Sequence, residues 1–191
     1  MKSNQIISLS ELKDYLAWNK TDNSKDAFFD FLIDAVSQIM EDYCSTKLKE
    51  TSVTETLSGD GSHLLILSNR HVTSLTSLKF REDTEFKDCF SSPEEMNQIV
   101  LYRGKFLYRC KGCFEEGVLN YQVSYTCGYA EVPPELKIVA MEMCTLAYQN
   151  SLHGEGRLGL LASRPGSVRM FFMDELPSHR TVLMKYMNVK I

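Results

Sequence analysis

The sequence lacks the patterns that would place it in a membrane or a secretory pathway. No apolar run approaches the ~20 residues that a membrane-spanning helix needs. Residues 1–18 alternate polar and apolar side chains, without the apolar core of a signal peptide. We therefore expect no membrane association and synthesis in a cytoplasm. Because that compartment is reducing, the six cysteines are expected to be free thiols.

The motifs of common catalytic and cofactor sites are also missing, with no GxSxG, HExxH or P-loop. Residues 154–159 match GxGxxG, but a nucleotide-binding loop follows a strand and opens a helix, whereas here a helical pattern comes before it. Cys110 and Cys113 form a CxxC pair without the further ligands that a tetrahedral zinc site requires. The sequence therefore predicts no catalytic residue, no cofactor and no metal site.

A positive net charge, which general nucleic-acid binding would favour, is absent as well. The formal net charge is −4, and it divides into −7 over residues 1–100 and +3 over residues 101–191. Residues 157–173 contain three arginines and no acid. The uneven distribution indicates two surfaces with different partners, although chance unevenness on a solvated surface is an equal alternative.

What is present is a switch from helical to alternating periodicity near residue 51 and back near residue 133. We predict an α+β fold with helices at both ends of an antiparallel β block. The expected helices are 9–18, 24–48, 136–152 and 174–186, and the expected strands are 51–57, 64–67, 72–80, 98–102, 106–109, 121–126 and 167–172. Residues 83–97 are expected to form a loop. The expected domains are a helical core of 1–50 and 130–152, a β block of 51–129 and a C-terminal arm of 153–191.

The predicted helices differ in their apolar faces. Helix 24–48 has one apolar stripe, and Asp26, Asp30 and Asp34 recur at four-residue steps on another face. This acidic face is either an ordinary solvated surface or the wall of an acidic channel. Helix 136–152 is apolar nearly all round, which favours cover from a neighbouring subunit in addition to its own chain.

The order of several short segments resembles a known family. The helix end Ile39–Cys44 precedes Thr54-Glu55-Thr56-Leu57-Ser58-Gly59, and Leu65-Ile66-Leu67 and Val72-Thr73-Ser74-Leu75 follow. Tyr125-Thr126-Cys127-Gly128-Tyr129 and Pro133-Pro134-Glu135-Leu136 then lead into the apolar helix. This ordered set, from about residue 8 to about residue 186, is similar to the head-tail connector, or head-completion adaptor, family of tailed bacteriophages. The sequence departs from the family at His71, where a proline is common.

The resemblance implies a structural virion protein that forms a ring, expected to be a dodecamer, beneath the portal protein. Double-stranded DNA would pass through the ring, and tail or stopper proteins would attach to it after synthesis in the bacterial host cytoplasm. In this setting Asp26, Asp30 and Asp34 would face the channel, because a basic wall would hold DNA phosphates. The predicted portal-docking arm consists of Arg157, Leu158, Leu160, Leu161, Arg164, Val168, Arg169 and Phe172.

Two alternative functions stay open from the sequence. The chain could be a small soluble binding or regulatory module with a metal site at the CxxC pair, which one bound zinc ion per chain would support. It could also be an enzyme without a recognisable motif, which a deep pocket holding acids of shifted pKa would support.

Overall fold

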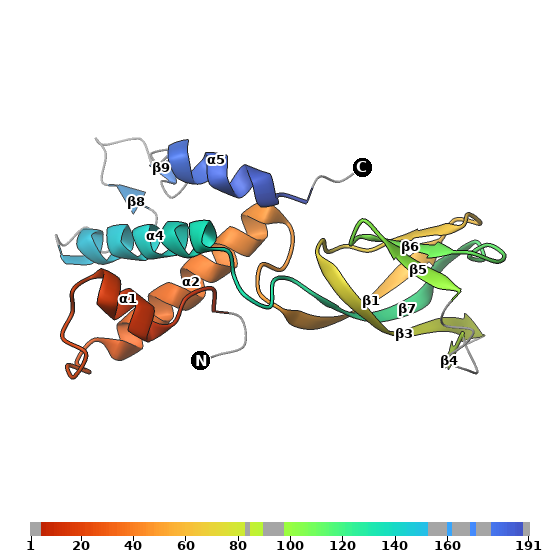
Figure 1. The fold of residues 1–191 in the computed structure, drawn as a ribbon, viewed down its shortest axis with the longest axis horizontal. Helices are drawn as coiled ribbons and strands as arrows, with labels where there is room; N and C mark the ends of the chain where they lie inside the picture. Colours follow the sequence, from red (N-terminus) through yellow and green to blue (C-terminus); the bar gives the residue numbers. More distant parts are fainter. Residues whose placement is uncertain are drawn as a thin grey trace. The chain divides into compact units, whose positions relative to one another are not determined.

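The computed structural model describes residues 5–82, 85–89, 98–152, 160–161, 169–170 and 177–188. By their internal contacts the residues divide into two compact units (Figure 1). The helical unit comprises Met1–Leu48 and Glu131–Ile191, and the β unit comprises Lys49–Ala130. Helices thus flank an antiparallel β block in the chain, which confirms the predicted α+β class.

The helical unit contains α1 (Leu9–Tyr15), α2 (Asp26–Cys44), α4 (Pro134–Leu152) and α5 (Pro177–Tyr186). Helix α1 begins with the predicted capping box, in which the Glu11 amide donates to Ser8 Oγ at 3.2 Å and the Ser8 amide donates to the Glu11 carboxylate at 2.7 Å. It ends earlier than predicted because Ala17 adopts a left-handed φ of 50°. A helix cannot continue through that backbone conformation.

Helix α2 ends at Cys44 rather than at the predicted residue 48. Ser45 has a φ of 52° and forms a left-handed C-cap. The carbonyls at this terminus that have no partner within the helix accept hydrogen bonds from the segment after α5. The Asn188 amide donates to the Cys44 carbonyl at 2.7 Å, and its side chain donates to the Ser45 carbonyl at 3.2 Å.

Helix α4 is covered by helices of its own unit. It packs against α1, α2 and α5, and its side chains Leu136, Val139, Ala140, Met143 and Cys144 are buried in one core. Ile138, 48% exposed, is the large apolar side chain that α4 leaves open to solvent within the described residues. Three neighbouring helices therefore account for much of the apolar character of α4, and additional cover from a neighbouring subunit stays a prediction.

The β unit contains two antiparallel sheets. The first has the strand order β1-β7-β3-β4 and the second has the order β2-β6-β5. Their bounds are β1 (Thr51–Gly59), β2 (Leu64–Ile66), β3 (Val72–Glu82), β4 (Glu85–Asp88), β5 (Ile99–Tyr102), β6 (Phe106–Arg109) and β7 (Gly117–Cys127).

In the β unit the strand predictions hold, to within a few residues at the strand ends, except in the segment 83–97. The predicted hairpin is confirmed, since Tyr102 pairs with Phe106 across a turn in which Arg103 and Gly104 have positive φ. Strand β4 lies where a loop was predicted, and it pairs with β3 through Lys79↔Asp88 to Glu82↔Glu85. Its sequence is too polar to give an alternating apolar signal, so only pairing with β3 defines it as a strand.

The core of the β unit is separate from that of the helical unit and centres on Tyr125 of β7. The Tyr125 ring is fully buried, and its hydroxyl donates to Glu55 Oε1 at 2.8 Å and accepts from Asn69 Nδ2 at 3.0 Å. Burial, the largest cause, raises the pKa of the Tyr125 hydroxyl, and the bond to Glu55 acts in the same direction. Because the hydroxyl both donates and accepts a hydrogen bond, the buried tyrosine fixes the position of β7 against β1.

Two short strands, β8 (Leu160–Leu161) and β9 (Arg169–Met170), form a separate antiparallel pair. The partners are Leu160↔Met170 and Leu161↔Arg169. Strand β9 falls inside the predicted strand 167–172, whereas β8 falls in a segment predicted to be a loop.

Candidate protein interface

The outer face of sheet β2-β6-β5 carries large apolar side chains that are exposed to solvent. Ile66 of β2 is 50% exposed, and Val100 and Tyr102 of β5 are 46% and 50% exposed. The opposite face of the same strands contributes Leu65 and Leu107 to the buried core. Because successive side chains of a strand point to opposite faces, this sheet is apolar on both sides. We call its outer side the apolar sheet face.

The apolar sheet face is hollowed by a groove of about 620 Å³. A guanidinium group stands at its side, since Arg103 lies 5.1 Å from the centre of the Tyr102 ring. A groove with aromatic walls and few polar groups has the composition of a protein-binding surface. The lining side chains are Leu64, Val100, Tyr102, Arg103, Phe106, Tyr108 and Cys110.

Sequence reasoning missed this face, although the chain carries a signal for it. The runs at residues 64–67 and 99–102 are continuously apolar, whereas a strand with one solvated face alternates apolar and polar residues. A continuous apolar run by itself predicts only a strand. Its outward-facing half predicts a surface that needs cover.

The three acidic residues predicted to line a channel are all half-buried on α2. Lys13 of α1, only 4% exposed, forms an ion pair of 2.5 Å with Asp26. Gln5 Nε2 donates to Asp34 Oδ1 at 3.0 Å. Two of the three carboxylates therefore bind residues from the N-terminal part of the same chain. Lys13 neutralises the charge of Asp26, and Gln5 gives Asp34 a hydrogen bond. The channel-facing role of Asp26, Asp30 and Asp34 stays a prediction.

Most of the predicted docking arm lies outside the described residues. This applies to Arg157, Leu158, Arg164, Val168 and Phe172, and to the GxGxxG segment 154–159. Leu160, Leu161 and Arg169 are described only as members of the β8–β9 pair. The docking role of these eight residues is therefore untested and stays a prediction.

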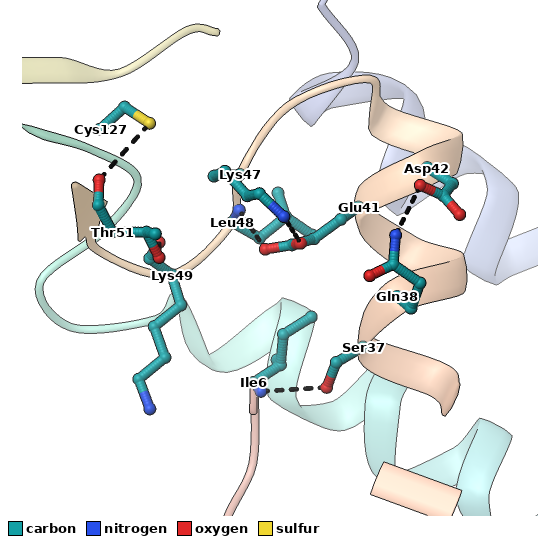
Figure 2. Close-up of polar contacts among 10 residues, drawn as sticks. All are labelled: Ile6, Ser37, Gln38, Glu41, Asp42, Lys47, Leu48, Lys49, Thr51 and Cys127. Carbon is teal, nitrogen blue, oxygen red and sulfur yellow. Dashed lines mark hydrogen bonds and ion pairs between the residues drawn. The ribbon is translucent and has the colours of Figure 1, made fainter. Parts of the chain in front are cut away.

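The segment that follows α2 in the helical unit is held by one buried carboxylate. Glu41 is 4% exposed, accepts from Lys47 Nζ at 2.6 Å and accepts from the Leu48 amide at 3.2 Å (Figure 2). At the middle of the same helix, Ser37 Oγ accepts from the Ile6 amide at 3.1 Å. Polar side chains on the inner face of α2 thus fix the residues before and after it in the chain.

The CxxC pair lies just after β6, and both of its thiols are free and exposed. His63, which precedes β2, reaches this turn: its Nδ1 lies 2.8 Å from the Gly112 carbonyl and its Nε2 lies 3.8 Å from Cys113 Sγ. Within the described residues, no three His, Cys, Asp or Glu side chains gather closely enough to hold a metal ion. In the same part of the chain, no helix has the length and apolar character to cross a membrane.

The sequence segments on which the resemblance depends have structural roles. Gly128 has a φ of 94°, and a Cβ there would lie 2.3 Å from the Lys49 carbonyl oxygen, so glycine is required. The Glu50 amide donates to the Tyr129 carbonyl at 3.0 Å, and the Tyr129 hydroxyl forms a hydrogen bond with His71. His71 itself has a φ of 53°, a value that proline cannot adopt. The backbone at this position therefore differs from the one that a proline here would require.

The apolar sheet face makes contact with another protein the main candidate role of this surface, and comparison with known proteins gives the family. The family model for head completion proteins, "HCP: Head completion protein", matches residues 5–152. The chain therefore belongs to the head completion protein family, which confirms the resemblance to phage head-tail connectors seen in its sequence. No match was found among curated protein sequences.

Chains in solved structures of gene transfer agent (GTA) particles share the fold. A chain in "Neck of empty GTA particle computed with C6 symmetry" superimposes with a TM-score of 0.69 at 12% identity, covering 97% of this chain and 91% of that one. A chain in "Virion of native gene transfer agent (GTA) particle" gives 0.65 at 13% identity, covering 100% and 97%. One in "Neck of native GTA particle computed with C12 symmetry" gives 0.57 at 13% identity with the same coverage. At such identities the likeness is one of fold.

Proposed function

We propose that this head completion protein is a structural subunit of a virion neck, where identical copies form a ring between the portal and the tail. Double-stranded DNA passes through the ring, and tail or stopper proteins attach to its far side. The observation that carries the assembly role is the apolar sheet face with its groove. Membership of the family and a fold shared with chains of GTA necks solved with sixfold and twelvefold symmetry support the ring.

The apolar sheet face fits a permanent interface between copies better than a transient one. Permanent homo-oligomer interfaces are more apolar than surfaces that spend time in water. A ring needs two different complementary faces on each subunit, because every copy contacts its two neighbours through different surfaces. In this proposal the apolar sheet face is one of the two, with Tyr102 beside Arg103 as its aromatic anchor.

The test is the mass of the purified chain in solution, alone and with a portal protein. The double variant Ile66→Asp and Tyr102→Asp places two carboxylates on the apolar sheet face, and we expect self-association at least about tenfold weaker. Both side chains are half exposed, so the monomer should keep its fold. Val118→Asp is the matched control, because Val118 is 82% exposed and does not line the groove.

Three outcomes of this experiment are informative. Rings in the wild type and the control but not in the double variant support the proposal. A wild type that stays monomeric both alone and with the portal contradicts the ring. Rings that persist in the double variant but no longer bind a tail or stopper protein show that the apolar sheet face contacts that partner instead.

We propose further that residues 153–172 dock on the portal. The anchors are Leu158, Leu160, Leu161, Val168 and Phe172, and the charged contacts are Arg157, Arg164 and Arg169. The support is the composition, since residues 157–172 hold three arginines and no acid, and such a segment gains from a partner that supplies acids and apolar cover. Deletion of residues 157–172 should leave rings intact and abolish portal binding. Unchanged portal binding would contradict the docking role.

The proposed acidic channel wall is best tested at Asp30 alone. A variant with lysine at all three positions would also remove the partners of Lys13 and Gln5, and so it could fail for lack of folding. Asp30→Lys should leave the ring assembled and slow DNA passage, more strongly at low salt. Normal DNA ejection by particles that carry Asp30→Lys would remove Asp30 from the channel wall.

A further inference from the structure

The turn after β6 places a thiol beside an imidazole of defined tautomer. The Arg109 amide donates to the His63 carbonyl at 2.9 Å, and the Phe114 amide donates to the Ser62 carbonyl at 2.8 Å, so the two segments are held together by backbone. His63 Nδ1 lies 2.8 Å from the Gly112 carbonyl oxygen. Because a carbonyl can only accept, Nδ1 carries the proton and Nε2 carries the lone pair.

The lone pair of His63 Nε2 faces the thiol of Cys113 at 3.8 Å, which is within the range of a hydrogen bond to sulfur. The Cys113 carbonyl accepts from Arg109 Nη1 at 2.9 Å, so a guanidinium group also lies beside this residue. A base in contact with a thiol is the feature that allows the thiol to transfer its proton and act as a nucleophile. Gly112, with a φ of 79°, forms the turn that brings these groups together.

The other described thiols differ from Cys113. Burial raises the pKa of the Cys44 and Cys89 thiols to about 11 and that of Cys144 to about 12. Cys127 is buried, and its thiol donates to the Thr51 carbonyl at 3.8 Å. Cys110 alone shares the exposure of Cys113, and it lies at the other end of the same four-residue turn.

We propose that Cys113 is a site of thiol–disulfide exchange with small disulfides and that Cys110 is the resolving thiol. His63 Nε2 takes the Cys113 proton, and the thiolate attacks one sulfur of the small disulfide. The other sulfur leaves as a thiolate and receives the proton from the imidazolium. Cys110 then loses its proton to solvent and attacks Cys113 Sγ. The bond between Cys113 Sγ and the small group breaks, and the second small thiolate leaves and takes up a proton from solvent. The two cysteines lose two electrons, and the small disulfide gains them.

This proposal goes beyond the neck role and concerns the unassembled chain, because assembly through the apolar sheet face would cover Cys110. One of the two sulfurs belongs to Cys110, which lines the groove of the apolar sheet face. Exchange at this turn would therefore join or separate two residues beside the proposed interface. The chemistry needs no metal and no further protein group.

The experiment uses the full chain and 4,4′-dithiodipyridine, an aromatic disulfide whose released thiol absorbs light. In the wild type we expect rapid release of two thiols per chain, no retained label, and a mass lower by two hydrogen atoms. Cys110→Ser should release one thiol and retain one label, on Cys113. Cys113→Ser should react about tenfold more slowly, and only at Cys110.

The role of the imidazole is tested by His63→Asn. The asparagine Nδ2 can still donate to the Gly112 carbonyl, so the turn is kept while the base at Nε2 is lost. We expect this variant to slow labelling of Cys113 about tenfold in the Cys110→Ser background and to leave Cys110 labelling in the Cys113→Ser background unchanged. The chain unfolded in urea gives the reference rate of an unassisted thiol.

The proposal is overturned if Cys113 in the folded chain reacts no faster than in the unfolded chain, or if His63→Asn leaves its rate unchanged. Retention of two labels by the wild type, on Cys110 and Cys113, would overturn the resolving role of Cys110.

Discussion

The helical unit and the β unit differ in how they bury their apolar side chains. Helix α4, which is apolar on most of its sides, packs against α1, α2 and α5 of its own unit. Sheet β2-β6-β5 encloses one face and leaves the other open. Within the described residues, each helix leaves one large apolar side chain exposed (Tyr15, Phe31, Ile138 and Met184). The β unit instead gathers several of them on one face of a sheet.

Polar groups show the same contrast. The helical unit places charges at the contacts between helices, as in the Lys13–Asp26 and Lys137–Glu11 pairs. The β unit satisfies its buried tyrosine with a neutral and an acidic partner, and its two exposed thiols, Cys110 and Cys113, lie with His63 at one turn. If the units are independent, damage to one should leave the other folded. The single tryptophan, Trp18, packs against Phe29 and Tyr148 and so reports on the helical unit alone.

The largest effect is expected from Gly128→Ala in the β unit. The new Cβ would lie 2.3 Å from the Lys49 carbonyl at a φ of 94°, so the variant should lose about 3 kcal/mol or more of stability. Gly61→Ala is the control, because Gly61 has a φ of 79° but open space around it, and it should lose only about 1 kcal/mol. Circular dichroism in urea should show the loss, while the Trp18 fluorescence transition stays in place. A matching shift of Trp18 would show that the units unfold together.

A smaller loss is expected from Lys13→Ala in the helical unit. Removal of the buried ammonium leaves Asp26, whose side chain is 27% exposed, without its ion-pair partner and should cost about 2–3 kcal/mol. Lys20→Ala removes the partner of Asp14 from an exposed pair of the same length and should cost under about 0.5 kcal/mol. Trp18 fluorescence in urea measures both variants. Equal losses would mean that burial of Lys13 adds nothing to its ion pair.

Tyr125→Phe should destabilise the β unit by about 1–2 kcal/mol, because it removes a buried hydroxyl that donates to Glu55 and accepts from Asn69. Tyr108→Phe, at a tyrosine that is 40% exposed, should have almost no effect on stability. Unfolding followed by circular dichroism distinguishes the two. A neutral Tyr125→Phe would show that water replaces the lost hydroxyl.

The smallest effect concerns pH and the contact between α4 and α5. Hydrogen bonds from the Tyr186 hydroxyl and from Lys185 lower the pKa of Glu135. A carboxylate whose pKa is lower in the folded state stabilises that state above its ordinary pKa, and the contribution is lost as the pH falls through the folded value. The urea midpoint of the helical unit should therefore decline below about pH 4. Glu135→Gln should remove part of this decline, and Tyr186→Phe should remove a smaller part. If the decline keeps its size in both variants, other titrating groups cause it.

Much of the fold could be predicted because the chain carries local signals for it. The capping box at Ser8 located the start of α1, and the alternating residues around Tyr121–Cys127 located β7. The helix ends could not be predicted, because residues without a turn signature, Ala17 and Ser45, take left-handed backbone conformations. Strand β4 was missed because its pairing with β3, rather than its own composition, defines it.

The candidate sites were predicted less well than the fold. Spacing alone put Asp26 and Asp34 on one face of α2, but it could not show that Lys13 and Gln5 bind them from the N-terminal part. The CxxC pair was visible in the sequence, whereas its contact with His63 joins residues fifty positions apart and depends on the pairing of β2 with β6. Long-range contacts of this kind have no local signature.

The ladder between β1 and β7 has a consequence for how such proteins diversify. Thr51 pairs with Cys127, and Lys49 bridges Tyr129, so the chain enters and leaves the β unit at adjacent points on neighbouring strands. An inserted unit whose two ends lie side by side adds little loop-closure entropy to the folding of the host domain, because the pairing of its own strands holds the ends together. Recombination could therefore exchange the β unit for another module without rebuilding the helical core. A lineage could change what the protein contacts while it inherits the same scaffold.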